Sequence, residues 1–236
     1  MFESLEGRRL LTVTIHQGFP GFYEVQGDES DNEISIEINP VEETFSIDGN
    51  TFGGVQQIAV YGNGGNDLIM VSAPASFLVS ASIDGGDGDD ILSLNFDGAV
   101  QGGPGNDRIY LYDSFRGEAR GGDGDDYIWI SGNCFDAYAD GEGGDDWIDA
   151  SSNWYKVFIH GGGGNDVIFG SNFGDQIFGD GGNDAIYGLG GDDIVYVRDG
   201  SYDCVDGGGD LNDTCFCDLS FGLMDGVSGF QNVFYG

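Results

Sequence analysis

The sequence is poor in positive charge and has no long apolar run. Seven Lys and Arg residues stand against 42 Asp and Glu, which gives a formal net charge of -35 over 236 residues. Such a chain repels a phosphate backbone and an anionic membrane surface. No segment has the apolar length that a membrane-spanning helix needs. We therefore expect no nucleic-acid partner and no transmembrane span.

Histidine is also scarce, which bears on catalysis. The two histidines, His16 and His160, belong to no His-Glu-x-x-His zinc motif, and no Gly-x-Ser-x-Gly nucleophile elbow is present. Some polysaccharide lyases and epimerases use charged groups on β-helical faces, and Arg108, Arg116 and Arg120 would suit that role. Local neutralisation of an acidic surface is the simpler interpretation of these arginines, so we predict that the protein is not an enzyme.

Cysteine is sparse and its state stays open at this point. Four residues allow one or two disulfides in an oxidising compartment, with three full connectivities. The alternative is buried thiols that pack as small hydrophobic groups. The residues concerned are Cys134, Cys204, Cys215 and Cys217.

Glycine and aromatic residues are abundant instead. The chain has 45 Gly, a hydrophobic fraction of 39% and an aromatic fraction of 13%. A disordered acidic tail lacks such apolar material. A core can therefore form, provided that cations offset the repulsion between carboxylates.

A nine-residue unit, Gly-Gly-x-Gly-x-Asp-x-U-x with U aliphatic, recurs along the chain. The best copies span residues 85–93 and 121–129, and close relatives span 102–110 and 161–169. The sixth position is Asp in nine units: Asp67, Asp90, Asp107, Asp126, Asp146, Asp166, Asp175, Asp184 and Asp193. Two residues later each unit has an aliphatic residue: Ile69, Leu92, Ile109, Ile128, Ile148, Ile168, Ile177, Ile186 and Val195. A rule this strict predicts that the aliphatic side chain points into a core.

The spacing of these Asp residues predicts stacked coils. Successive steps are 23, 17, 19, 20, 20, 9, 9 and 9 residues, so two nine-residue units make one coil. One predicted column of turns contains Asp67, Asp90, Asp107, Asp126, Asp146, Asp166, Asp184 and a continuation at Asp203. The other contains Asp175, Asp193 and a continuation at Asp213. Between residues 90 and 166 the second column has lost the motif, so we expect few or no ions there.

The composition of the turn suits a hard divalent cation. Glycines adopt positive φ and turn the backbone sharply, so that several carbonyl oxygens face one point. Asp adds a carboxylate oxygen at the end of the turn. Ca²⁺ takes six to eight oxygen ligands at about 2.3–2.6 Å. One turn cannot supply that number, but two turns stacked one coil apart can.

The unit closely resembles the nonapeptide of hemolysin-type, or RTX, proteins over roughly residues 62 to 215. That resemblance implies an all-β fold, a right-handed parallel β-roll of short stacked coils, with the nine Asp residues as ligands of several Ca²⁺ ions. Glu142 stands where the second glycine of its turn belongs, so we expect a distortion there. Six gaps in the first column and one in the second predict about seven ions, if each gap holds one.

Metal binding is then expected to drive folding. We expect a chain that is unfolded at low calcium and folds outside the cell. Its location would be extracellular or at a bacterial cell surface. A structural or adhesive role is the leading interpretation.

The predicted organisation has four parts. Residues 1–14 form an export- or sorting-type segment, residues 15–60 a β-rich cap or first coils, residues 61–217 the calcium-binding β-roll, and residues 218–236 a C-terminal cap. The first segment resembles a short N-terminal motif of some bacterial secreted and surface proteins, through Phe2, Glu3, Leu5, Glu6, Arg8, Leu10 and Leu11.

Outward strand positions are rich in aromatic residues. One column would contain Tyr110, Trp129, Phe169 and Tyr187, and another Phe178 and Tyr196. Ladders of this kind usually stabilise neighbouring strands. The alternative is an exposed binding surface, so the second candidate function is binding or processing of extracellular or cell-surface polysaccharide.

Overall fold

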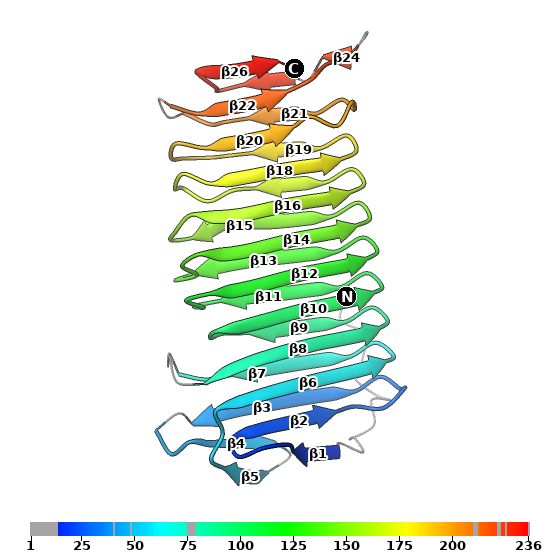
Figure 1. Ribbon diagram of the computed structural model, residues 1–236. Helices are drawn as coiled ribbons and strands as arrows, with labels where there is room; N and C mark the ends of the chain where they lie inside the picture. Colours follow the sequence, from blue (N-terminus) through cyan, green and yellow to red (C-terminus); the bar gives the residue numbers. More distant parts are fainter. Residues whose placement is uncertain are drawn as a thin grey trace, which may run out of the picture.

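Figure 1 shows the computed structural model of the chain. It describes residues 14–39, 41–47, 49–74, 79–209, 212–220, 223–224 and 226–235. The residues that carry the predicted N-terminal motif lie outside these ranges.

The described residues form two long sheets that run the length of the molecule. In spatial order, the first sheet consists of β1 (Thr14–Gln17), β2 (Phe22–Gln26), β6 (Gln57–Gly64), β8 (Ser80–Asp87), β10 (Gly98–Pro104), β12 (Gly117–Asp123), β14 (Ala137–Gly143), β16 (Val157–Gly163), β18 (Gln176–Gly181), β20 (Ile194–Val197), β22 (Thr214–Cys217) and β26 (Asn232–Tyr235).

In the view of Figure 1, the second sheet lies behind the first. Its order is β25 (Gly226–Ser228), β21 (Cys204–Asp206), β19 (Ala185–Tyr187), β17 (Val167–Phe169), β15 (Trp147–Asn153), β13 (Tyr127–Gly132), β11 (Arg108–Tyr112), β9 (Ile91–Leu94), β7 (Leu68–Ser72), β3 (Glu33–Asn39), β4 (Thr44–Ile47) and β5 (Asn50–Gly53). A separate antiparallel pair joins β23 (Leu219–Ser220) and β24 (Leu223–Met224).

The chain winds as a β-solenoid. Each coil contributes one strand to each sheet, and neighbouring strands are parallel from β2 to β26 in the first sheet and from β3 to β25 in the second. We call the side where the chain passes from the first sheet to the second the first edge, and the opposite side the second edge. The first edge forms the regular row of turns at the right of Figure 1. The predicted all-β fold of stacked parallel coils is confirmed, and no helix able to cross a membrane occurs in the described ranges.

The core is built from the predicted aliphatic positions. All nine of these side chains have 0% exposure. Along β11 the burial alternates, with Ile109 and Leu111 inside and Arg108 outside. Strand side chains alternate between faces, so one aliphatic per half-coil gives a continuous column of rungs between the sheets.

The two ends of the solenoid are built differently. At the N-terminal end, β1 pairs antiparallel with β2, and the β4–β5 hairpin pairs antiparallel with β3. At the other end, β25 and β26 continue the parallel pairing of the coils before them. The strands of residues 15–60 thus belong to the same two sheets as the repeat, while the predicted domain boundaries remain predictions.

Aromatic side chains stack from coil to coil outside the core. On the first sheet, Phe178, Tyr196 and Phe216 follow one another with ring centroids 4.6 and 4.8 Å apart and nearly parallel planes. On the second sheet, Phe169 and Tyr187 stack at 4.8 Å. In these ladders the ring faces cover one another, which stabilises adjacent coils.

The predicted aromatic column of the second sheet is interrupted. Trp129 pairs with Asp149, and Asp149 pairs with Phe169. The column is therefore divided into two parts. Phe169 and Tyr187 form one ladder, and Tyr110 and Trp129 form a separate edge-to-face contact with ring centroids 6.2 Å apart. The carboxylate of Asp149 breaks the stack that the sequence had predicted as continuous.

Two of the cysteines, Cys134 and Cys204, have free thiols and form no disulfide. The Cys134 thiol is buried and donates to the carbonyl oxygen of Ser131 at 3.2 Å, and burial raises its pKa to about 11. It is therefore one of the small hydrophobic groups that the second interpretation of cysteine anticipated.

Candidate calcium site

A ladder of hydrogen bonds runs along the first edge through the sixth residue of each turn. Its repeating unit is one backbone amide and one carboxylate: the N–H of Asp107 donates to Oδ1 of Asp126 at 2.7 Å, and the N–H of Asp126 donates to Oδ1 of Asp146 at 2.8 Å. The ladder contains, in order, Asn32, Asp67, Asp90, Asp107, Asp126, Asp146, Asp166, Asp184 and Asp203. The predicted first column, including its continuation at Asp203, is confirmed as an arrangement in space.

In six of these carboxylates the second oxygen has no hydrogen-bond partner. The Asp side chains of the ladder are at most 3% exposed, so water does not reach them. Oδ2 is buried and unpartnered in Asp90, Asp107, Asp126, Asp146, Asp166 and Asp184. A buried carboxylate oxygen without a donor is costly. The turns are thus built around oxygens that need a cation or a proton.

The first glycine of each turn leaves room for these oxygens. A Cβ built on Gly121 would overlap Oδ2 of Asp126 and would lie 2.7 Å from the carbonyl oxygen of Gly141 in the next coil. The same pairing of a carboxylate oxygen and a next-coil carbonyl occurs at Gly62, Gly85, Gly102, Gly141 and Gly161. Glycine is required here because any side chain would fill the space on which the two oxygens converge.

The glycines at the second and fourth positions of the unit direct further carbonyl groups along the stack. Gly122 and Gly124 have φ of 128° and 131°. A Cβ on Gly122 would overlap the carbonyl oxygen of Gly103, and one on Gly124 that of Gly105. Successive turns therefore face each other with oxygen atoms, from both main chain and side chain, and this is the donor set that Ca²⁺ prefers.

The side chains alone do not make a metal cluster. Within the described ranges, no group of three or more His, Cys, Asp or Glu side chains converges on one point. Each coil contributes a single buried carboxylate to the ladder. A cation between coils would be held largely by backbone carbonyls, which agrees with the prediction that two turns must share one ion.

Burial raises the pKa of the ladder carboxyl groups. Loss of hydration is the largest cause, and the charges of nearby Asp residues add to it, while the accepted backbone hydrogen bond opposes it. The pKa rises to about 8 for Asp90 and Asp126, to about 7 for Asp146, Asp166 and Asp184, and to about 6 for Asp107. Without a metal, the folded turns therefore favour protonated carboxyl groups near neutral pH.

The second edge has a shorter ladder. The N–H of Asp175 donates to Oδ1 of Asp193, and that of Asp193 to Oδ1 of Asp213, so the predicted second column is confirmed in space. Asp175 differs from the first-edge residues because both of its oxygens accept protein hydrogen bonds, from the N–H groups of Val157 and Ser171. Its turn has Ser171 and Phe173 in place of two glycines, so Asp175 is the least suited of the nine predicted ligands.

Where the second edge lacks the motif, Val157 and Ala137 stand in line with Asp175, and asparagine amides elsewhere in the turns link neighbouring coils. Oδ1 of Asn95 accepts the N–H of Ala73 at 2.8 Å, and Oδ1 of Asn153 accepts that of Cys134 at 3.1 Å. The amide oxygen makes the same kind of coil-to-coil hydrogen bond without bringing a charge. These turns need no cation, which supports the expectation of few or no ions on this side.

The turn at Glu142 keeps its place in the stack. Glu142 has φ of 69° and pairs in register with Gly122. Asn63, at the corresponding position of an earlier turn, has φ of 77°. Both residues accept the left-handed conformation at some cost in strain. The expected distortion is therefore confined to backbone strain.

The sequence did not reveal two features of the first edge. The ladder begins one coil earlier than predicted, at Asn32, because the β4–β5 hairpin lengthens the step to Asp67. A second, exposed ladder runs through the fifth positions, where each N–H donates to Oδ1 of the preceding coil: Asp31, Asn66, Asp89, Asn106, Asp125, Asp145, Asn165 and Asn183. The recurrence of Asn or Asp at this position was the signal that could have indicated it.

Comparison with known proteins agrees with this geometry. The family model described as the RTX calcium-binding nonapeptide repeat matches the chain in four copies, over residues 94–114 and 169–201. The chain carries RTX calcium-binding repeats. No curated protein and no solved structure matches the chain significantly.

The RTX turns fit calcium by the criteria of the structure itself. Between Asp90 and Asp184, the unpartnered Oδ2 atoms, the glycine cradles and the facing carbonyls form an all-oxygen donor set at the gaps of the first edge. When bound, Ca²⁺ would supply the positive charge that keeps these carboxylates ionised inside the fold. The chain's own contribution is to present each carboxylate rigidly, through its Oδ1 hydrogen bond. The nine Asp residues remain predicted ligands.

Acidification should promote folding of the RTX turns when calcium is absent. Carboxyl groups whose pKa is raised in the folded state stabilise that state below their unfolded value of about 4, and this stability is lost as pH rises through about 6–8. In excess chelator, β-structure measured by circular dichroism should be greater at pH 5 than at pH 8. The comparison stops at pH 5 because the isoelectric point is about 4.1, and a protein with little net charge tends to precipitate. Equal spectra at both pH values would contradict the role of the buried column.

Replacing one ladder carboxylate by its amide should have opposite effects with and without metal. In chelator, Asp126→Asn should shift pH-induced unfolding to higher pH, because the amide keeps the Oδ1 acceptor and removes a buried charge. At pH 7.5 the calcium concentration for half-folding should rise roughly fivefold, equivalent to about 1 kcal/mol. Asp125→Asn, at the exposed fifth position of the same turn, is the matched control: it removes a charge that only adds to the raised pKa of Asp126 and should shift both midpoints less. Parallel shifts in both variants would argue against a special role for Asp126.

A methyl group in the turn should block the stack. Gly124→Ala places a Cβ against the carbonyl oxygen of Gly105 in a backbone region with φ of 131°. We expect a loss of at least about 1–3 kcal/mol in the unfolding free energy of the calcium-loaded protein. The control is Gly53→Ala, where the methyl group would meet open space. Urea unfolding of both variants measures the difference, and similar midpoints would refute the close approach of the coils.

Proposed function

We propose that this calcium-binding repeat protein works outside the cell or at the cell surface, where Ca²⁺ folds it into a rigid rod with a structural or adhesive role. The observation that carries the proposal is the buried first-edge column, in which each of the six coils from Asp90 to Asp184 adds a carboxylate with one unpartnered oxygen. A chain of net charge -35 gains little stability from such a column unless cations neutralise it.

The location follows from calcium availability. Extracellular calcium modules bind with dissociation constants of about 10⁻⁴ to 10⁻³ M. At the far lower concentrations inside a cell, such sites would be empty and the carboxylates would repel one another. The chain would therefore stay unfolded before export and fold afterwards, because metal binding to the native state contributes directly to its stability.

The proposal is for a non-catalytic protein. The parallel stack makes a stiff rod whose length is set by the number of coils, and rods of this kind suit spacing or adhesion at a surface. The resemblance to RTX proteins, and the sequence motif in residues 1–14, support export. The chain offers neither of the zinc or serine motifs considered above.

Calcium titration under native mass spectrometry, with circular dichroism in parallel, tests the proposal. We expect a cooperative gain of β-structure at pH 7.5 as calcium rises to millimolar levels, with about seven ions bound if each suitable gap holds one. Magnesium is the control cation, because its demand for near-octahedral geometry suits carbonyl-rich turns poorly.

Two outcomes would contradict the proposal. One is full β-structure at pH 7.5 in excess chelator. The other is equal folding by magnesium and calcium, which would show that the turns bind divalent cations without selectivity for calcium.

A further inference from the structure

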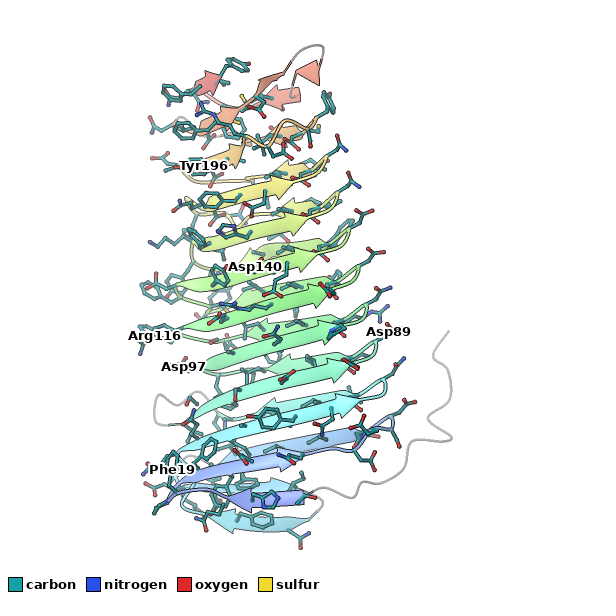
Figure 2. The ribbon with its side chains drawn as sticks, turned by 45° about the vertical axis from the view of Figure 1, so that its right-hand side comes forward. Phe19, Asp89, Asp97, Arg116, Asp140 and Tyr196 are labelled. Carbon is teal, nitrogen blue, oxygen red and sulfur yellow. The ribbon has the colours of Figure 1, made fainter. Side chains whose placement is uncertain are left out.

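The outer face of the first sheet has two hollows in line along the axis of the solenoid. The first spans β6 to β12, has a volume of about 370 Å³ and is floored by Ser82 and Ala99. The second spans β14 to β20, has a volume of about 460 Å³ and is bordered by Phe158 and Gln176. Figure 2 shows this face, with Asp140 and Tyr196 on it and the two edges at either side, marked by Asp89 and Arg116.

The two hollows belong to one column of outward side chains. Ser82 pairs with Ala99, and the column then continues through Glu118, Tyr138, Phe158 and Gln176 in successive strands. Small side chains open the first hollow. Glu118 lines the first hollow and Tyr138 the second, and these residues are neighbours in register. A ligand lying along the column would therefore pass directly from one hollow into the other.

The walls combine apolar surface with paired charges. In the first hollow Arg120 lies in salt-bridge contact with Glu118. Beside the second hollow, Nζ of Lys156 lies 4.0 Å from Asp136. Each cation thus has an acidic neighbour, and the remaining polar groups include amides and hydroxyls. Asp84 in the first hollow and Asp192 in the second add further negative charge, so these walls offer carboxylate acceptors for hydroxyl groups and repel anionic ligands.

This chemistry selects a ligand. An acidic polymer would be repelled by the net charge of -35, and a cationic one would prefer the acidic first edge. A neutral chain of sugar rings has hydroxyl groups for the acidic and polar walls and an apolar surface for the half-buried rings of Tyr138 and Phe158, which stack with centroids 5.7 Å apart.

The length of the surface points to a polymer rather than to a single sugar. From β6 to β20 there are seven steps between neighbouring strands, which is about 33 Å at about 4.7–4.9 Å per step. We propose that the outer face of the first sheet, from β6 to β20, binds a linear neutral polysaccharide that lies along the solenoid axis through both hollows. The polysaccharide would be a partner of the extracellular protein proposed above. Its binding rests on that proposed function only because it needs the folded state.

The test uses the calcium-loaded full chain in native gels that contain hydroxyethyl cellulose, glucomannan or dextran, with alginate as the acidic comparison. We expect retardation by at least one neutral polymer and none by alginate. In calorimetry with oligosaccharides of the retarding polymer, affinity should increase with chain length until both hollows are filled. Retardation by alginate alone, or by no neutral polymer while circular dichroism shows the folded state, would overturn the proposal.

Substitutions locate the binding surface. Gln101→Ala in the first hollow and Gln176→Ala in the second should each weaken oligosaccharide binding about 3- to 10-fold, the usual effect of one lost hydrogen bond. Trp147→Ala, an exposed aromatic on the opposite sheet, is the control and should bind as the unchanged protein does. Equal weakening in all three variants, or in none, would place any binding elsewhere. The calcium midpoint, measured for each variant, reports separately on the proposed folding function.

Discussion

Each coil of this solenoid buries one carboxylate on the same edge, at the spacing of neighbouring strands. Two unit charges about 5 Å apart repel each other by about 3 kcal/mol at an effective dielectric constant of about 20. A column of eight such groups, from Asp67 to Asp203, is an arrangement that the hydrophobic core alone does not stabilise readily. The hydrogen bond to Oδ1 holds every carboxylate in place, but in the six from Asp90 to Asp184 it leaves Oδ2 without a hydrogen-bond partner. The conditions under which the chain folds are therefore set by what neutralises the other oxygen.

The two edges solve the same stacking problem in different ways. The first edge keeps the charge and leaves an oxygen-lined gap between turns. Before Asp175 in the chain, the second edge has Val157 and Ala137 at the equivalent position, and the uncharged amides of Asn95 and Asn153 link neighbouring coils. That edge is then free to carry other groups, such as the stacked rings of Phe115 and Phe135. One fold thus separates an edge with a continuous column of buried carboxylates from an edge where such a column begins only at Asp175.

The sequence predicts the parts of the structure that depend on the strict repeat. Glycines, Asp and an aliphatic at fixed offsets were enough to predict the coils, both columns and the buried rungs such as Ile128. The repeat could not indicate Asn32, because the β4–β5 hairpin separates it from Asp67 and no motif surrounds it. It could not show that Ser171 satisfies Asp175, because that contact depends on a turn which departs from the motif. The hollows also escape prediction, since they arise from the relative sizes of side chains in different coils.

The calcium edge and the proposed carbohydrate face are connected through strand spacing. The hollows contain no ladder carboxylate other than the backbone-satisfied Asp175, yet their alignment depends on eight strands being stacked in register. A polymer that spans those strands binds only the stacked state. By linkage, it must then favour calcium binding by the same factor by which calcium favours the polymer. The rod would therefore be most stable where both calcium and polysaccharide are present, although the two ligands touch different sides of each coil.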